Sequence, residues 1–526
     1  MMRDRFVSVH ALRVAFLAAA CAVRPFAAGA QAVEQREVPS QNSISDSLHD
    51  LQAEVSELKS LVVEMREEVA RSHAETVELR RELEANHERA STESPEGAPT
   101  AAQQVGGASR PETSQTVAAR MEKLEENQQL LAAKVDDQYQ TKIESASKYR
   151  VRFSGIVLFN LFSNVGAVDN VDFPALAADP GPLVPRVTLG GSLRQSQFGF
   201  EAFGPDVAGA RTTADIQFDF SGGFPNAPNG VTFGFARLRT GTIRFDWHHT
   251  SIILGQDTLF LSPLAPTSLA SLAEPALSYS GELWSWTPQI RVEHRLDFSE
   301  SSNLLVQAGL LDSLSGQTPV SEYRRAPQIG QTTRQPAYAA RLAWTHGIFG
   351  IPFTVGQGGY YARQDWGFSR KVDAWAATTD FNLSFSPRWA LSGEFYRGRG
   401  VGGLGGGIGG SIVLNGPISD PATAVQGLDS LGGWAQLKYR ATGRIEFNSA
   451  FGQDNPLGSE VRNSSSGQQN YFSAWLARNQ TSLFNVIYHP RSDVLMSLEY
   501  RHVRTFTTIA APYSANHVDM SVGVLF

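Results

Sequence analysis

Alternation of apolar and polar residues constrains this chain most, and it runs from Tyr149 to the last residue. Residues 213–220 show it clearly, because Ala, Ile and Phe occupy every second position with Thr, Asp and Gln between them. Successive side chains of a strand point to opposite faces, so such a segment predicts a strand with one apolar and one polar face. The same pattern recurs in residues 151–162, 380–385, 444–451 and 494–501.

A transmembrane β-barrel accounts for these strands better than a soluble β-sandwich, whose strands also alternate. Tight connections, such as residues 204–209 and 299–302, take turns with long ones, such as residues 163–191 and 398–430. Short periplasmic turns and long external loops are typical of outer-membrane barrels. No apolar run approaches the ~18 residues that indicate a membrane-spanning helix, so any membrane residence is as a barrel.

We predict an all-β transmembrane barrel over residues 149–526, with about 16 antiparallel strands. An even number of strands places both ends of this domain on the periplasmic side of the membrane. A barrel of this size leaves an aqueous lumen, whereas side chains fill the interior of an eight-stranded barrel. The final strand places Val522, Val524 and Phe526 on one face, and this pattern predicts that Phe526 is the insertion signal of an outer-membrane barrel.

The N-terminal residues have the layout of a secretory signal peptide. Arginines precede the apolar run of residues 14–23, and the small residues 28–30 follow it. This layout predicts a signal peptide over residues 1–30 and export from the cytoplasm. Cys21 is the single cysteine of the chain and lies inside this segment, so its removal leaves no thiol for catalysis, zinc binding or a disulfide. A lipobox-like interpretation of residues 17–21, with lipidation of Cys21, is the alternative.

Two helical stretches are expected between the signal peptide and the barrel. Heptad spacing of apolar residues predicts an α-helical coiled coil over residues 41–90, in the periplasm. Residues 91–115 are rich in Ser, Pro and Gly and predict a flexible linker, and a shorter heptad pattern predicts a second helix over residues 116–147. The heptad seam favours an oligomer without fixing its size, and a lone amphipathic helix is the alternative.

Four stretches of the sequence resemble the DcaP-like porins, a family of trimeric outer-membrane porins of Gram-negative bacteria. They are residues 138–149, 193–200, 262–273 and 284–291. The resemblance implies a homotrimer of barrels with about 16 strands each, forming a general or dicarboxylate-favouring channel. It also implies that the coiled coil lies in the periplasm.

Arginine is the prevailing cation of the barrel region, where Lys371 and Lys438 are the lysines after residue 150. Guanidinium groups bind carboxylates through paired hydrogen bonds, so a wall of arginines favours anions. Phe233 and Phe235 lie an even number of residues before Arg237, so in a regular strand all three side chains would point to the same face. A bulge near Gly241 would restore the register. The pore-lining candidates are Arg194, Arg211, Arg237, Arg239, Arg244, Arg291, Arg295 and Arg341. In the alternative, these arginines only brace the wall by pairing with Asp215, Asp219, Asp246 and Glu293.

The long connection from Asp257 to Leu283 is rich in alanine and leucine, which is unusual for a loop in water. By resemblance to sixteen-stranded porins, the loop after the fifth strand folds into the lumen and sets the constriction. Its acids Asp257, Glu274 and Glu282 would then face the arginines and create a transverse electric field. A loop that covers a trimer interface is the alternative.

Several classes of function are not supported by the sequence. A net charge of −7 and a pI near 5.9 give no basic field for nucleic acid. No spacing of His and acids suggests a metal site, and no Ser-His-Asp arrangement suggests an enzyme or a catalytic residue. The glycine-rich residues 402–410 lack the Lys-Ser/Thr that follows a phosphate-binding loop, so we expect a flexible external loop and no cofactor.

The sequence therefore predicts passive diffusion of small hydrophilic, anionic solutes across the bacterial outer membrane, through a barrel in contact with membrane lipid. The family resemblance implies that these solutes are dicarboxylate-like and that the channel is a homotrimer. A structural anchor whose coiled coil contacts the cell wall is one alternative. A carbohydrate channel is another, and it requires aromatic residues stepping along the lumen. Candidates for such a track are Phe233, Phe235, Trp284, Trp286 and Trp434.

Overall fold

The computed structural model describes residues 150–526, except 182–184, 318–323, 349–350, 464–467 and 471–475. The predicted signal peptide, coiled coil, linker and second helix lie outside the described residues. None of the helices within the described part of the chain is long and apolar enough to cross a membrane.

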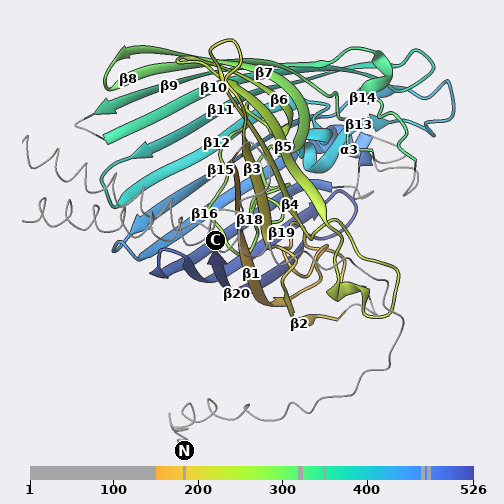
Figure 1. Cartoon of the computed structure of the whole chain (residues 1–526). Coiled ribbons are helices and arrows are strands. Elements are labelled where there is room, and N and C mark those ends of the chain that lie inside the picture. The colour runs from red at the N-terminus through yellow and green to blue at the C-terminus, as the bar shows by residue number, and fades with distance from the viewer. Residues whose placement is uncertain (1–149, 182–184, 318–323, 349–350, 464–467, 471–475) are drawn as a thin grey trace, which may run out of the picture. The chain divides into compact units, whose positions relative to one another are not determined.

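A single antiparallel 17-stranded sheet forms the body of the described region (Figure 1). Pairing of β1 with β20, from Ile156–Leu525 to Val165–Asn516, closes the sheet into a barrel. The strands of the first half are β1 (Val151–Val165), β2 (Val187–Ser192), β3 (Gln197–Phe203), β4 (Arg211–Asp219), β5 (Arg237–Asp246), β6 (Thr250–Thr258), β7 (Trp286–Ser299), β8 (Ser302–Leu311) and β9 (Ala337–Ile348). Those of the second half are β10 (Ile351–Asp365), β11 (Lys371–Ser384), β12 (Trp389–Arg399), β15 (Asp429–Arg440), β16 (Ile445–Pro456), β18 (Leu476–Arg491), β19 (Val494–Thr507) and β20 (Tyr513–Leu525).

Strands β2 and β3 share one position in the barrel. β3 pairs with Val151–Ile156 at the start of β1, and β2 pairs with Asn160–Val165 at its end. The backbone leaves the ladder between them, at residues 193–196. The 17 strands therefore occupy 16 positions around the ring, which confirms the predicted strand number.

The long connections lie at one end of the barrel, as the sequence predicts, together with two short ones at residues 366–370 and 508–512, and the connections at the other end are short. β5 and β6, β7 and β8, and β18 and β19 are joined by tight turns. The chain also ends on this side, where Phe526 and Gly155 exchange main-chain hydrogen bonds of 3.1 and 3.0 Å. The long connections contain the small sheet of β13 (Gly410–Leu414), β14 (Val425–Gly427) and β17 (Gln468–Asn470), with the short helices η1 (Gly230–Thr232), η2 (Gln331–Thr333), η3 (Gly402–Leu404), η4 (Gly407–Gly409) and α3 (Gly458–Asn463).

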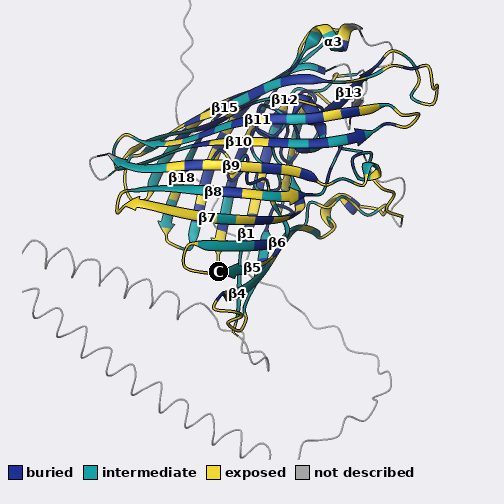
Figure 2. Cartoon of the chain, turned by 90° about the horizontal axis from the view of Figure 1, so that it is seen from above, coloured by how far each residue is buried: buried dark blue, intermediate teal, exposed yellow. Residues whose placement is uncertain are grey.

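Buried, intermediate and exposed residues follow one another along the strands (Figure 2). Many of the exposed residues are apolar and many of the buried ones polar, which is the reverse of the pattern in a soluble protein. On β1, Phe159 is 42% exposed on the outer face, whereas its neighbour Asn160 is fully buried inside. On β20, Met520 is 45% exposed, whereas Asp519 and Ser521 are fully buried. Polar side chains inside and apolar side chains outside are the pattern of a transmembrane barrel, so the outer face is suited to lipid.

A bulge in β5 determines which face of the strand its arginines occupy. Gln217 of β4 pairs with Thr240, but Phe218 pairs with Leu238, so Arg239 is the extra residue. The predicted bulge is therefore present, at Arg239 rather than at Gly241. Because β5 begins at Arg237, the preceding phenylalanines lie outside the strand and place no constraint on its register.

A charged residue on the outer face tests this orientation. We expect Phe159→Arg, midway along β1, to lower the free energy of unfolding in lipid by about 2–4 kcal/mol, because the guanidinium enters hydrocarbon. Phe298→Arg, beside the turn between β7 and β8, is the matched control and should lower it by about 0–1 kcal/mol. Denaturant titration in lipid vesicles measures both. Equal effects at the two positions would contradict the placement of the membrane.

Candidate functional site

The connection between β6 and β7, residues 259–285, runs through the interior of the barrel. Near its start, the Leu261 carbonyl accepts a 2.6 Å hydrogen bond from Thr378 of β11, and the Leu264 N–H donates at 2.7 Å to Glu394 of β12. Further along, the Leu269 carbonyl accepts a 3.0 Å bond from Asn160 of β1. One loop reaches the inner wall on widely separated strands only if it crosses the lumen. We call residues 259–285 the lumen loop.

The lumen loop follows the fifth position of the barrel, counting β2 and β3 as one. Its place inside the lumen agrees with the arrangement that the family resemblance implied. Most of its apolar residues are buried, including Leu261, Ala270, Ala273 and Leu277 at 0% exposure. The alternative of a loop that covers a trimer interface is therefore wrong, because the loop contacts the inner wall of the barrel.

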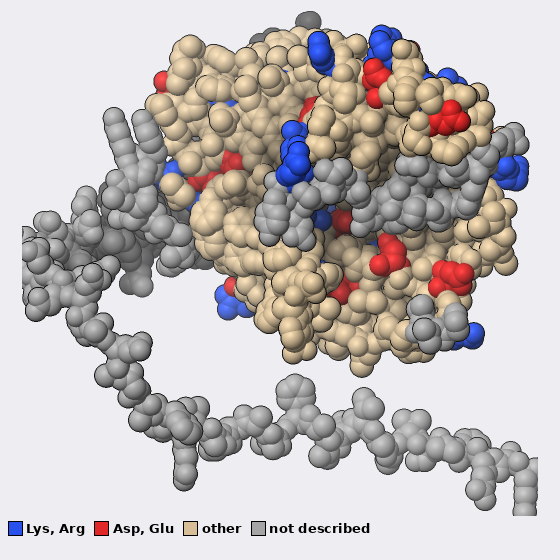
Figure 3. Space-filling view, turned by 90° about the vertical axis from the view of Figure 1, so that its right-hand side faces the viewer, with Lys and Arg blue, Asp and Glu red and all other residues tan. Residues whose placement is uncertain are grey.

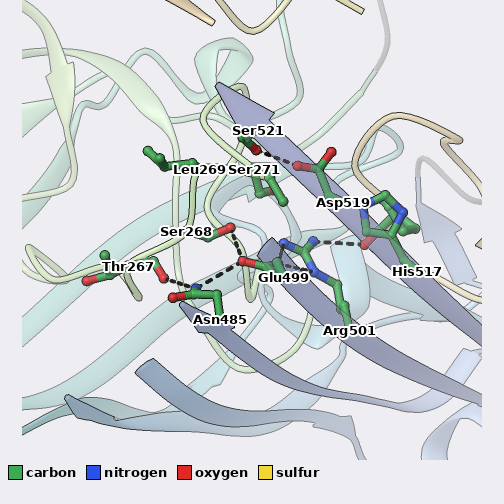
Figure 4. Close-up of polar contacts among 12 residues, drawn as sticks. Thr267, Ser268, Leu269, Ser271, Asn485, Glu499, Arg501, His517, Asp519 and Ser521 are labelled. Carbon is green, nitrogen blue, oxygen red and sulfur yellow. Dashed lines mark hydrogen bonds and ion pairs between the residues drawn. The ribbon is translucent and has the colours of Figure 1, made fainter. Parts of the chain in front are cut away.

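Side chains of the wall bind the main chain of the lumen loop (Figure 4). Asn485 of β18 donates to the Thr267 carbonyl at 2.8 Å, and the Ser268 hydroxyl donates to Glu499 of β19. Arg501 lies beside Glu499, with 2.7 Å between its Nη2 and the carboxylate, and is 1% exposed. No local signal in the sequence marks this cluster, because its members alternate like every other inward-facing residue.

A second attachment comes from the break between β2 and β3. The Gln195 side-chain oxygen accepts hydrogen bonds from the N–H groups of Leu272 and Ala273 at 2.8 and 3.0 Å, and its amide donates to the Ala270 carbonyl at 3.0 Å. Buried main-chain groups outside a ladder need such partners. The interruption of the strand therefore supplies a clamp for the middle of the lumen loop.

The glycine-rich residues 402–410 also bind the lumen loop, which corrects the expected flexible external loop. Most of this segment is buried. The main-chain N–H of Trp284 donates to the Leu404 carbonyl at 2.9 Å, and a Cβ at Gly405 would lie 2.9 Å from the Trp284 ring. Gly405 has φ of +80° and Gly407 of +56°, conformations that favour glycine over other residues. Glycine is therefore required here for close packing and backbone shape.

Two of the predicted arginines meet on one carboxylate beside the lumen loop. Arg237 Nη2 and Arg239 Nη1 lie 2.7 and 2.8 Å from the same oxygen of Asp219, which is fully buried. Both also donate to the Ala273 carbonyl, at 2.6 and 3.3 Å. Their guanidinium groups lie 4.8 and 4.7 Å from the ring centre of Trp286. Two cations share one anion, so this cluster has a net positive charge.

Other arginines of the wall are paired with acids as well. Each is less than a tenth exposed and lies on or beside a strand. Of the predicted bracing acids, Asp219, Asp246 and Glu293 pair with arginines, whereas Asp215 accepts a hydrogen bond from Thr242 instead. Three further partners, Asp172, Asp257 and Asp380, lie outside the predicted set. The ion pairs join Arg194 to Asp172, Arg291 to Asp257 and Glu293 at 2.7 and 2.8 Å, and Arg341 to Asp380 at 2.7 Å.

Three of the predicted arginines lie towards the end with the tight turns, away from the lumen loop. Arg211 is exposed at the start of β4. Arg244 contacts Asp246 at 3.1 Å, and Arg295 contacts Asp297 at 3.1 Å beside the turn between β7 and β8. The structure therefore divides the arginine wall into a group beside the loop and a group near the opposite end.

The three predicted acids have different surroundings. Asp257 belongs to β6 rather than to the loop, and it pairs with Arg291. Glu282 is 1% exposed, and burial, reinforced by the nearby Glu394, raises its pKa well above the usual range. Burial therefore favours the neutral form of Glu282, which weakens what this residue can add to a transverse field. Glu274 remains as the acid of the lumen loop that faces open space.

Glu274 faces a cavity of about 720 Å³ between the lumen loop and the connections that follow β1 and β4. Burial raises the pKa of Glu274 to about 7, while Arg237 opposes the shift. Acidic and basic side chains are interspersed on the face of the molecule that carries the long loops (Figure 3). The principal polar lining residues of the cavity are Asp169, Arg194, Ser221, Arg237, Glu274 and Tyr279.

The aromatic candidates for a sugar track do not line up along the lumen. Phe233 and Phe235 are 61% and 50% exposed and precede β5. Trp434 is buried in an apolar cluster with Leu277 of the lumen loop. Trp284 and Trp286 lie edge to face, with ring centres 5.6 Å apart. Only this last pair remains as a candidate aromatic platform among the five.

Together these features define a closed 16-stranded antiparallel barrel with a polar interior and a loop held across its lumen. Among solved structures, the outer membrane channel DcaP of Acinetobacter baumannii aligns with 73% of this chain and 100% of its own, at 15% identity and a TM-score of 0.56. An anion-selective porin from Comamonas acidovorans aligns with 72% of this chain and 100% of its own, at 11% identity and a TM-score of 0.43. No protein-family model and no curated protein sequence matches the chain. The chain has the fold of the DcaP channel, which agrees with the resemblance in its sequence.

Removing one of the hydrogen-bond acceptors on the wall tests whether the wall holds the lumen loop in place. Glu394→Ala removes the carboxylate that accepts from the Ser262 hydroxyl and the Leu264 N–H. We expect a higher and noisier ion conductance in planar bilayers, because the start of the loop loses its fixed position. Glu446→Ala, an inward acid that pairs with Lys438 instead of the loop, is the matched control and should leave conductance unchanged. Identical conductance of the two variants would show that the loop needs no such attachment.

Proposed function

We propose that this protein is a porin of the bacterial outer membrane that allows passive diffusion of small hydrophilic solutes. The observation that carries the proposal is the loop held across a polar lumen, beside a charged cavity at the long-loop end. Such a loop narrows a wide barrel to the size of small solutes, and charged groups at the narrow zone act on what passes. The 15%-identical neighbour with this fold is itself an outer membrane channel, which supports the proposal.

The proposed assembly is a homotrimer in contact with membrane lipid, with the N-terminal coiled coil in the periplasm. Trimerisation rests on the resemblance to DcaP-like porins. Phe526 packs against Phe153 and Phe198, with ring centres 5.0 and 5.8 Å apart, at the seam where the barrel closes. This exposed aromatic end is consistent with the proposed role of Phe526 as insertion signal.

A preference for anions is the finer part of the proposal. Arg237 and Arg239 share Asp219, so their cluster has a positive charge in excess. Dicarboxylate-like solutes are the class that the family resemblance suggests. A carbohydrate channel receives less support, because the aromatic candidates are dispersed.

Neutralising the arginines beside the lumen loop tests the anion preference. The triple variant Arg237→Gln, Arg239→Gln and Arg291→Gln leaves Asp219, Asp257 and Glu293 without their cationic partners. Fixed charges within a Debye length of ~8 Å control local ion concentration. We expect the reversal potential in a KCl gradient to shift toward cations, with a smaller shift at high salt. Arg295→Gln, near the tight turns, is the control and should cause little shift.

An unchanged reversal potential in the triple variant, combined with a lower unfolding temperature, would contradict the anion preference. In that case the arginines only brace the wall. Circular dichroism of the same preparations measures the unfolding temperature.

The pKa of Glu274 predicts how selectivity depends on pH. Because its pKa is raised to about 7, Glu274 loses its negative charge as the pH falls from 8 to 6. Arg237, Arg239, Asp219 and Asp169 are the charged groups that act on it. We expect the anion preference to increase as the pH falls through 7, measured by reversal potential. Glu274→Gln should remove this dependence, and a variant that retains it would assign the titration to another group.

A further inference from the structure

The cavity at the long-loop end has uncommitted hydrogen-bond donors on its arginines. Arg194 uses Nη2 on Asp172, and its Nε and Nη1 have no hydrogen-bond partner among the described residues. Arg237 uses Nε and Nη2 on Asp219 and the Ala273 carbonyl, and its Nη1 likewise has no partner within that set. These guanidinium groups can therefore donate to a carboxylate that enters the cavity.

Glu274 supplies the opposite chemistry in the same cavity. Its carboxylate has no hydrogen bond or ion pair with any described residue, and the residue is only partly buried. Asp169, by contrast, accepts hydrogen bonds from the N–H groups of Ala175 and Leu176 at 3.1 and 2.9 Å, within its own loop. Glu274 is thus the acid of the cavity that is available to a ligand.

We propose that this cavity binds solutes with a carboxylate at one end and a protonated amine at the other, and so favours zwitterions over dicarboxylates. The carboxylate accepts from Arg194 and Arg237, and the ammonium group donates to Glu274. A dicarboxylate of the same length brings its second carboxylate against Glu274, and like charges repel. A volume of about 720 Å³ is within the range of pockets for small molecules.

This inference rests on the proposed channel function and differs from the dicarboxylate preference that the family resemblance suggests. It assigns a role to Glu274 that bracing of the wall does not require, because Glu274 braces no described side chain. Arg194 and Arg237 remain fixed by Asp172 and Asp219, so the cavity is held in shape before a solute arrives.

Three solutes with the same five-carbon chain and a carboxylate at one end differ only in the charge at the other end. They are 5-aminopentanoate, glutarate and pentanoate. The purified full-length protein is reconstituted into liposomes at pH 8, where Glu274 is ionised, and osmotic swelling measures each flux. In Glu274→Gln, we expect the ratio of 5-aminopentanoate to glutarate flux to fall by about 25-fold, because the attraction of the amine and the repulsion of the second carboxylate are both lost, and one charge pair at about 4 Å in water supplies a factor of about five. Pentanoate flux should not change.

Glu300→Gln, on the exposed turn between β7 and β8, is the matched control and should keep the wild-type ratio. A ratio that is the same in wild type and Glu274→Gln would overturn the zwitterion preference. Potassium chloride conductance of the same preparations separates the two proposals. A protein that conducts without the change in ratio contradicts this inference alone, whereas one that does not conduct contradicts the channel function itself.

Discussion

Closure of the strand ladder between β1 and β20 is the constraint on which the rest of the structure depends. A closed sheet leaves no row of unpaired main-chain groups at an edge, which is the condition for strands to cross a membrane. Closure also gives the sheet an inside and an outside, and the period of two then directs Asn160, Asp219, Glu394 and Glu499 inward. The polar wall is thus a consequence of the same alternation that makes the outer face apolar.

The polar wall in turn makes an irregular loop possible inside the barrel. Main-chain groups of residues 259–285 lie away from any ladder, and they need hydrogen-bond partners where they are buried. Gln195, Asn485 and Glu394 provide them from different sides of the ring. The wall therefore both holds the lumen loop and, with Arg194, Arg237 and Glu274, sets the charge beside it. Fixation of the loop and selection of solutes depend on the same set of inward-facing side chains.

The burial of the lumen loop follows from the apolar composition of residues 257–283, and its place inside the barrel follows from the family resemblance. The barrel, its strand number and the bulge in β5 follow from local signals in the sequence, namely alternation and turn residues. The partners of the lumen loop do not. Ser262 and Glu394 are 132 residues apart, and Ser268 and Glu499 are 231 apart, so only the three-dimensional register brings them together. The raised pKa of Glu282 and the burial of glycines 402–410 were missed for the same reason, because both depend on packing against distant strands.

Single-channel recording of the unmodified protein in a planar bilayer tests the central claim most directly, namely that a lumen crossed by this loop still conducts. The account predicts discrete, reproducible conductance steps in KCl, with a reversal potential that favours anions more strongly at pH 6 than at pH 8. A folded, inserted barrel that shows no conductance steps would contradict it. The lumen loop would then be a plug, and the chain a membrane anchor instead of a channel.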